Sequence, residues 1–292
     1  MMLITGATGQ FGGKAVEHLL NKGVQPSQIT LLVRDAEKAK KFEAKGINIR
    51  IGDYQNEASL MMAMQDIDKL FLVSSNDKQA YENRTVHHKA VIDAAKQANV
   101  KHIFYTSFVR IPGYEQSAIA GFQQSHVDTE ATLKDSGITY TILQNGIYFE
   151  MLPIFTGADV AKNGTILFPA GNGKASYVLR EELAEAAAHV LTTEGHENKT
   201  YSLTNTTSFN FHDVAEAIGN TIDKDISYVS PDVAEYEAIL KQANVPEAFA
   251  GVFSMWALAQ AQGTMDVEDD TLEQFLGRKP TSLQQFINIL YK

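Results

Sequence analysis

The sequence contains no cysteine. This absence excludes disulfide bonds, catalysis by a thiolate, and zinc or iron–sulfur sites that are built on cysteine. Positive charge is also scarce, because 25 Lys and Arg residues stand against 35 Asp and Glu residues and leave a net charge of −10. A surface that binds nucleic acid needs clustered basic residues. We therefore expect no nucleic acid among the partners of this protein.

Long apolar runs and metal-binding patterns are missing as well. No stretch approaches the roughly 18 apolar residues of a membrane-spanning helix. A glycine-rich segment that starts at Gly6 leaves no room for the apolar part of a signal peptide. His87 and His88 are adjacent but have no further ligand at a spacing that suits a metal. The sequence predicts a cytoplasmic protein, monomeric or homodimeric, that enters no membrane and holds no metal.

The first half of the 292-residue chain alternates short apolar segments with longer helical patterns. Near-continuous apolar strands are typical of a sheet that is covered on both faces, and a regular alternation of strand and helix favours parallel pairing. We predict an α/β fold, a Rossmann-type doubly wound parallel sheet, with strands at residues 2–5, 29–33, 47–51, 69–74, 102–107 and 140–143.

The segment LITGATGQFGG joins the first predicted strand to the first predicted helix. Glycine at positions 6, 9 and 12 permits a tight turn and a close approach of the backbone to a ligand, and the free N–H groups at a helix start favour a pyrophosphate. The predicted cofactor-binding residues of this loop are Gly6, Thr8, Gly9, Gln10, Phe11 and Gly12. The alternative is a turn that has only a structural role.

The end of the second strand indicates which dinucleotide is bound. Arg34 stands where an NAD-binding domain carries an acidic residue for the ribose 2′-hydroxyl, and its guanidinium suits a 2′-phosphate. Lys38, one helical turn further, adds a second positive charge. This pattern predicts NADP(H) in preference to NAD(H). Asp35 is adjacent, so an exposed Arg–Asp pair without a ligand is the alternative.

Polar residues follow the next strands at the same edge of the predicted sheet. Asp53 and Tyr54 follow the third strand, and we expect them near the adenine. Ser74 and Ser75 follow the fourth strand near the cofactor ribose, and Ser107 ends the fifth. Caps of the following helices are the alternative for Asp53 and for the serines at 74 and 75.

Six segments together carry a family resemblance: GATGQFGG, LLVRDAEKAK, GDY, VKHIFYTS, SGITYTILQNGIY and GRKPTSLQQFI. They resemble the NmrA-like group of atypical short-chain dehydrogenases/reductases, closest to the bacterial NAD(P)H:quinone oxidoreductase type 2 and triphenylmethane reductase group. The resemblance implies an NADPH-dependent reductase that transfers hydride to a small-molecule acceptor, a quinone or a similar conjugated, dye-like aromatic molecule.

The resemblance breaks at the catalytic pair of the wider superfamily, because no tyrosine in this chain has a lysine four residues later. His126 stands where related reductases carry a lysine, eleven residues before Gly137, and a histidine there can donate a proton near neutral pH. Glu130, one helical turn later, can position it. The alternative is that His126 only shares an apolar stripe of its helix.

Two residues after the sixth strand complete the predicted catalytic set. Asn145 can bond the nicotinamide carboxamide or a substrate carbonyl, and Tyr148 can stack on a flat aromatic substrate. A core aromatic residue is the alternative for Tyr148. Without the Tyr–Lys pair, a non-catalytic NADP(H) sensor of the NmrA type stays open as a function. A sugar-nucleotide epimerase is disfavoured for the same reason.

The regular alternation of strand and helix patterns becomes less clear after Asn145. We expect residues 1–150 to form the NADP-binding core. Residues 151–292 are expected to complete that core and to form a smaller, mainly helical lobe on the substrate side, within a single compact unit.

Overall fold

The computed structural model describes residues 1–75, 80–157 and 159–291. The chain forms two interleaved units. Unit 1 contains Met1–Phe108, Gln124–Asn145 and Arg180–Ser202, and unit 2 contains Val109–Gln123, Gly146–Leu179 and Leu203–Lys292. The chain thus passes into unit 2 for Val109–Gln123, leaves unit 1 again after Asn145, and returns to it for one helix and most of one strand.

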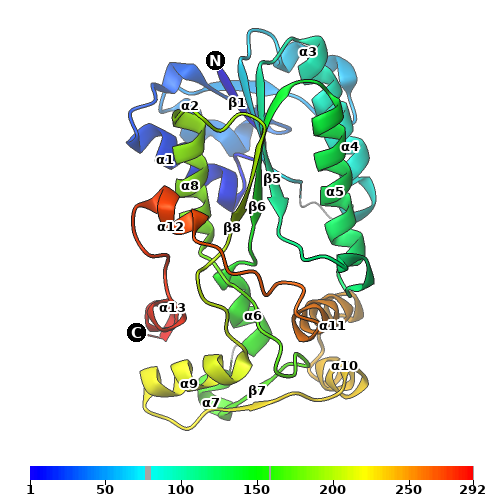
Figure 1. The fold of residues 1–292 in the computed structure, drawn as a ribbon, viewed down its shortest axis with the longest axis vertical. Coiled ribbons are helices and arrows are strands. Elements are labelled where there is room, and N and C mark those ends of the chain that lie inside the picture. Colours follow the sequence, from blue (N-terminus) through cyan, green and yellow to red (C-terminus); the bar gives the residue numbers. More distant parts are fainter. Residues whose placement is uncertain (76–79, 158, 292) are drawn as a thin grey trace. The chain divides into compact units, whose positions relative to one another are not determined.

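Unit 1 is built on a seven-stranded sheet with the order β3-β2-β1-β4-β5-β6-β8 (Figure 1). Every strand pair whose register is described in this sheet is parallel. The Rossmann-type α/β fold expected from the sequence is thereby confirmed. The strands are β1 (Met2–Ile4), β2 (Ile29–Val33), β3 (Asn48–Ile51), β4 (Lys69–Leu72), β5 (His102–Phe108), β6 (Thr139–Asn145) and β8 (Lys199–Leu203).

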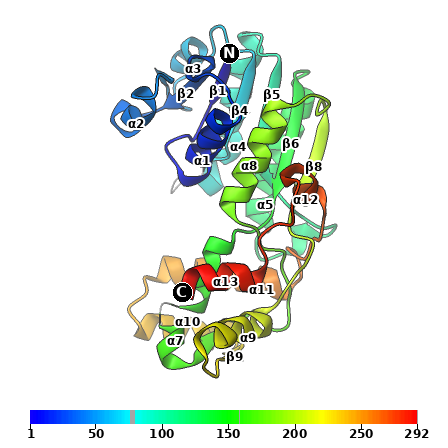
Figure 2. The same cartoon turned by 90° about the vertical axis from the view of Figure 1, so that its left-hand side faces the viewer.

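Helices cover both faces of this sheet (Figure 1). On one face, α3, α4 and α5 contribute apolar side chains to a buried cluster with β1, β4, β5 and β6. On the other face, α1 and α8 pack side by side (Figures 1 and 2). The helices are α1 (Gln10–Asn21), α2 (Lys40–Glu43), α3 (Glu57–Ala63), α4 (Ala80–Gln97), α5 (Ala120–Asp135) and α8 (Arg180–Thr192).

The strand order explains where a ligand is expected. The chain runs outward from β1 through β2 to β3, then crosses to β4 and continues in the opposite direction. Such a switch point lies between β1 and β4, and in doubly wound sheets ligands bind beyond the carboxyl ends of the strands at that place. All five residues of β2 are buried, which is why its sequence ITLLV carries no alternation and its polar neighbours begin only at its end.

Unit 2 is mainly helical. Its two-stranded sheet pairs β7 (Thr165–Leu167) with β9 (Ser227–Val229) in parallel. Figure 2 shows α9 and α13 of this unit side by side, and Asn210 caps α9 by accepting bonds from the backbone N–H groups of His212 and Asp213. The helices are α6 (Leu152–Thr156), α7 (Val160–Asn163), α9 (Phe211–Ile222), α10 (Val233–Gln242), α11 (Glu247–Ala261), α12 (Thr271–Leu276) and α13 (Leu283–Tyr291). Among the helices described in the two units, none is long and apolar enough to cross a membrane.

Candidate cofactor-binding site

The glycine loop follows β1 and passes directly into α1. Gly6 has a φ of +62°, a left-handed conformation that side chains rarely adopt. A Cβ added at Gly12 would lie 2.5 Å from the carbonyl oxygen of Gly6 and 2.9 Å from Cα of Ala7. The loop therefore folds back on the first turn of α1 so closely that only glycine fits at position 12. A close turn of backbone before a helix start is what a phosphate seat requires.

The other predicted loop residues differ in their surroundings. Thr8 and Gln10 are exposed. Phe11 is buried, and its ring packs near that of Phe71 with the ring centroids 6.2 Å apart. The side chain of Phe11 thus anchors α1 to the sheet, and only its backbone belongs to the loop.

The end of β2 carries the predicted basic residues on the surface. Arg34 is the first residue after β2, and both it and Lys38 are exposed. The carboxylate of Asp35 accepts a bond from the backbone N–H of Glu37 at 3.0 Å and caps the turn Ala36–Ala39. Asp35 therefore serves the turn at the strand end.

Asp53 and Tyr54 follow β3 and have different roles. The Asp53 carboxylate accepts from the backbone N–H of Gln55 at 2.9 Å and shapes the turn, while Asn56 caps α3. The Tyr54 hydroxyl bonds the side chain of Thr5 and lies within the field of Arg34. Enclosure of this hydroxyl raises the pKa of Tyr54 to about 12, although Thr5 and Arg34 partly oppose the shift.

Side chains of α4 bond the backbone that follows β4. The N–H of Ser75 donates to Nε2 of His88 at 3.2 Å, and the carbonyl of Ser75 accepts from the buried guanidinium of Arg84 at 3.0 Å. The N–H of Ser74 donates to the Thr106 hydroxyl at 2.8 Å. His88 is fully buried, and burial together with the nearby charge of Arg84 lowers its pKa to about 3. His88 is therefore a neutral structural residue that fixes this strand end.

Ser107 and Glu130 form a buried pair below the same edge. The Ser107 hydroxyl donates to Oε1 of Glu130 at 2.5 Å, and the Gln144 amide donates to the same oxygen at 3.1 Å. Glu130 is 2% exposed. These contacts tie the carboxylate to β5 and β6, and the role of Glu130 in positioning His126 stays a prediction.

His126 lies on α5 and is also 2% exposed. Its Nδ1 is 2.7 Å from the hydroxyl of Tyr105, a buried residue of β5. Its ring lies near that of Phe108, with the centroids 6.4 Å apart. The sequence did not single out Tyr105, because an apolar strand gives no sign of which tyrosine meets a helix residue.

Asn145 ends β6 and is 2% exposed, and its Oδ1 has no hydrogen-bond partner among the described residues. A buried acceptor without a donor is costly, so this atom is suited to a ligand N–H. Tyr148 belongs to unit 2, where it is half-buried and its backbone pairs with that of Val178. The structure brings Asn145 to the same sheet edge as the glycine loop, whereas Tyr148 is described only within unit 2.

Arg180 is a further residue of this region. It is the first residue of α8, and its guanidinium Nη1 donates to Oε1 of Gln10 in the glycine loop. Next to it, Glu181 accepts from Lys14 at 3.1 Å and lies 2.8 Å from Nε2 of His18. The sequence VLREELAEAAA indicates that a helix starts near Arg180. It does not indicate that this helix packs against α1, so the contact with Gln10 could not be predicted.

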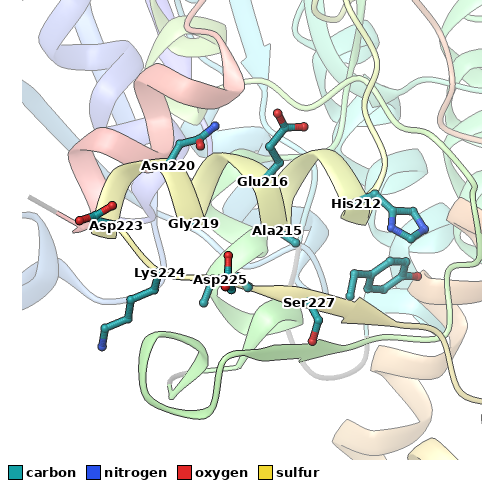
Figure 3. Close-up of a pocket in the computed structure, with 11 residues that line it drawn as sticks. His212, Ala215, Glu216, Gly219, Asn220, Asp223, Lys224, Asp225 and Ser227 are labelled. Carbon is teal, nitrogen blue, oxygen red and sulfur yellow. The ribbon is translucent and has the colours of Figure 1, made fainter.

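A separate pocket lies in unit 2 along α9 and β9 (Figure 3). Glu216 and Asn220 project from α9, and Lys224 and Asp225 come from the turn that follows it. The pocket contains none of the residues that the sequence predicted. Groups of three or more residues that could hold a metal ion are absent from the described part of the chain.

Comparisons with known proteins show the family of this chain. The family model described as NAD(P)H-binding matches residues 6–194. Quinone oxidoreductase 2 of Escherichia coli is 34% identical over 291 residues, which cover 100% of this chain and 99% of that protein. Its crystal structure with NADPH matches with a TM-score of 0.91 and covers 100% of both chains.

Two further relatives cover nearly the whole chain. The crystal structure of Citrobacter sp. triphenylmethane reductase complexed with NADP(H) is 34% identical, has a TM-score of 0.91 and covers 99% of each chain. An NmrA-like family domain-containing oxidoreductase of Aspergillus flavus is 31% identical over 283 residues, 95% of this chain and 91% of that protein.

The fold and its glycine edge define a dinucleotide-binding protein of the Rossmann type. The chain belongs to the NAD(P)H-binding family, and within it to the NmrA-like oxidoreductases. The family resemblance read from the sequence and the prediction of an NAD(P)H-dependent oxidoreductase are confirmed.

Proposed function

We propose that this protein uses NADPH to reduce a quinone or a similar conjugated aromatic acceptor. The observation that carries the proposal is the sheet edge of unit 1, where a loop that admits only glycine at position 12 lies at the same end of the strands as the unpaired Oδ1 of Asn145. Relatives named as quinone oxidoreductase and triphenylmethane reductase support the acceptor class.

The residues at this edge suit a dinucleotide. Backbone N–H groups between Gly9 and Gly12 would hold the pyrophosphate, and Oδ1 of Asn145 would accept from the carboxamide of the nicotinamide. The bound nicotinamide would supply the hydride. The fixed strand ends at Ser74 and Ser75 form a rigid wall for the riboses, because both backbone N–H groups are already bonded.

Arg34 supports a preference for NADPH. It is exposed directly after β2, where NAD-binding domains carry an acidic residue for the ribose 2′-hydroxyl. Asp35, which follows Arg34 in the chain, is bonded to the backbone of Glu37. A 2′-phosphate at this position would meet a guanidinium rather than a carboxylate, which favours the phosphorylated cofactor.

His126 is the proposed proton donor. In the protonated ring Nδ1–H would donate to the Tyr105 hydroxyl, and Nε2–H would pass its proton to the reduced oxygen of the acceptor, which leaves His126 as the neutral imidazole. Tyr105 would act as a positioning residue that holds the ring in this orientation. A quinone accepts hydride readily, so the chain needs to supply alignment and one proton rather than a Tyr–Lys pair.

The test is turnover by the purified protein. NADPH is mixed with a panel of benzoquinones, naphthoquinones and triphenylmethane dyes, and the absorbance of the reduced nicotinamide is followed. The proposal expects consumption of NADPH that depends on the acceptor and is faster than with NADH. Tight binding of NADPH without turnover on any acceptor would refute it and favour a sensor of NADP(H).

A further inference from the structure

The contact between Arg180 and Gln10 joins two helices at the phosphate-binding edge. Gln10 is the first residue of α1, inside the glycine motif, and Arg180 is the first residue of α8. They are far apart in the sequence but bond through Nη1 of Arg180 and Oε1 of Gln10. The side chain that contacts the glycine loop is thus Arg180, which is always positively charged, although the net charge of the protein is −10.

The chemistry of this contact fixes the orientation of an amide. A guanidinium has only N–H donors, so the end of the Gln10 amide that faces Arg180 must be the oxygen. The two N–H donors of the amide then point away from Arg180. Gln10 is exposed and lies between Gly9 and Gly12, so a ligand in the glycine loop would meet donors rather than an acceptor.

Neighbouring ion pairs keep the two helix starts in this arrangement. Glu181, next to Arg180, contacts Lys14 at 3.1 Å and His18 at 2.8 Å, and Lys14 also contacts Glu17 at 3.2 Å. The ion pairs with Glu181 and Glu17 raise the pKa of Lys14. These surface pairs contribute little stability individually, but together they hold the first turn of α8 against α1.

We propose that Arg180 is a positioning residue for the cofactor: it holds the Gln10 amide so that its N–H donors face a pyrophosphate oxygen. This inference rests on the proposed seat of the cofactor at the glycine loop. It assigns Arg180 to the part of the ligand that NADPH and NADH share, whereas Arg34 is assigned to the 2′-phosphate that distinguishes them.

Calorimetry without any acceptor tests the assignment, with NADPH, NADH and ADP-ribose as ligands. Arg180→Ala is expected to weaken all three by the same factor, about tenfold, which corresponds to one hydrogen bond near a charged group. Unchanged affinities would overturn the inference, and so would a loss confined to NADPH or to the two ligands that carry nicotinamide. If the unmodified protein binds none of the three ligands, the cofactor seat itself fails.

Variants of Gln10 separate positioning from a direct effect of charge. Arg180→Ala combined with Gln10→Ala is expected to bind no more weakly than Gln10→Ala alone, because Arg180 acts through Gln10. Additive losses would contradict this. Gln10→Glu keeps a hydrogen-bond partner for Arg180 but turns a carboxylate oxygen toward the phosphate. This variant should therefore bind the three ligands more weakly than Gln10→Ala does. Equal or tighter binding would count against the inference.

Two more variants serve as control and rescue. Lys22→Ala removes an exposed positive charge from the far end of α1, away from Gln10 and from the ion pairs with Glu181, and we expect its affinities to stay within about twofold of the unmodified protein. A tenfold loss in this control would mean that general charge, not Gln10, is responsible. Arg180→Lys keeps a donor-only group and should restore part of the affinity that Arg180→Ala loses, and no recovery would oppose a positioning role.

Discussion

The replacement Gly12→Ala is the sharpest test of the glycine loop, because the structure places backbone atoms where the new methyl group would lie. The added Cβ would be 2.5 Å from the oxygen of Gly6, 2.8 Å from its carbonyl carbon and 2.9 Å from Cα of Ala7. Ordinary contacts begin at 3.4 Å, so the Gly6 carbonyl must retreat by about 0.9 Å. Backbone cannot rotate away as a side chain does, and the loop has to open.

The size of the effect follows from this displacement. A shift of nearly 1 Å weakens one or two hydrogen bonds from the loop to a phosphate, each contributing about 1.5–3 kcal/mol. We expect the dissociation constant for NADPH to rise by about 100-fold. The free energy of unfolding should fall by only about 1–3 kcal/mol, the usual cost of overpacking, so the variant should still be folded.

Gly13→Ala is the matched control on the same helix turn. Its added Cβ would lie 3.3 Å from the oxygen of Ala7 and 3.7 Å from Cζ of Phe42, which requires little movement, and alanine is favoured in a helix by about 1 kcal/mol. Titration calorimetry with NADPH and thermal unfolding of the ligand-free proteins measure the two effects. Equal affinities of Gly12→Ala and the unmodified protein, or equal losses in both variants, would refute the reasoning.

Three further predictions concern the rest of unit 1. Arg34→Ala should weaken NADPH about tenfold and NADH less than about twofold by calorimetry; equal losses would remove the 2′-phosphate role. His126→Ala should lower kcat about 100-fold with NADPH affinity unchanged, and Tyr105→Phe should lower it less; an unchanged kcat in His126→Ala removes it from the reaction. The pKa of His88 is about 3 when folded and 6.5 in the reference state, so the unfolded chain binds the proton first as the pH falls. The free energy of unfolding should therefore decrease by about 1.4 kcal/mol per pH unit between pH 6.5 and 3. Urea unfolding should show a shallower pH dependence in His88→Gln, and an identical slope would contradict the assignment.

The fold was predictable because its signals are local. The run ITLLV is apolar apart from Thr30, and the structure buries every residue of β2 at the predicted bounds, Ile29–Val33. The fourth predicted strand was too long by two residues, because β4 ends at Leu72. Beyond that end, the backbone N–H of Ser74 donates to the side chain of Thr106. Apolar periodicity defines where a strand passes through the core, whereas its end depends on partners that the sequence does not display.

The side-chain pairs of the site were less predictable for the same reason. The one-turn spacing of His126 and Glu130 predicts a contact along α5, and it did not indicate that the carboxylate also reaches Ser107 and Gln144 on the neighbouring strands. His126 in turn meets Tyr105, which is 21 residues away in the chain. Helical spacing indicates which residues share a face, and only the packed sheet decides which partners that face meets.

These contacts also explain why Asn145 differs from its neighbours at the sheet edge. Ser107 and His126 have protein partners below the carboxyl ends of the strands, so this layer is formed before any ligand binds. In unit 1, the described residues leave two buried side-chain oxygens without a partner, those of Thr30 and Asn145. Thr30 lies within β2, where the strand is buried throughout, but Asn145 ends β6 at the edge where cofactors bind in this fold. A preformed polar layer with one unmatched acceptor at its ligand-facing end is what a site for a carboxamide N–H requires.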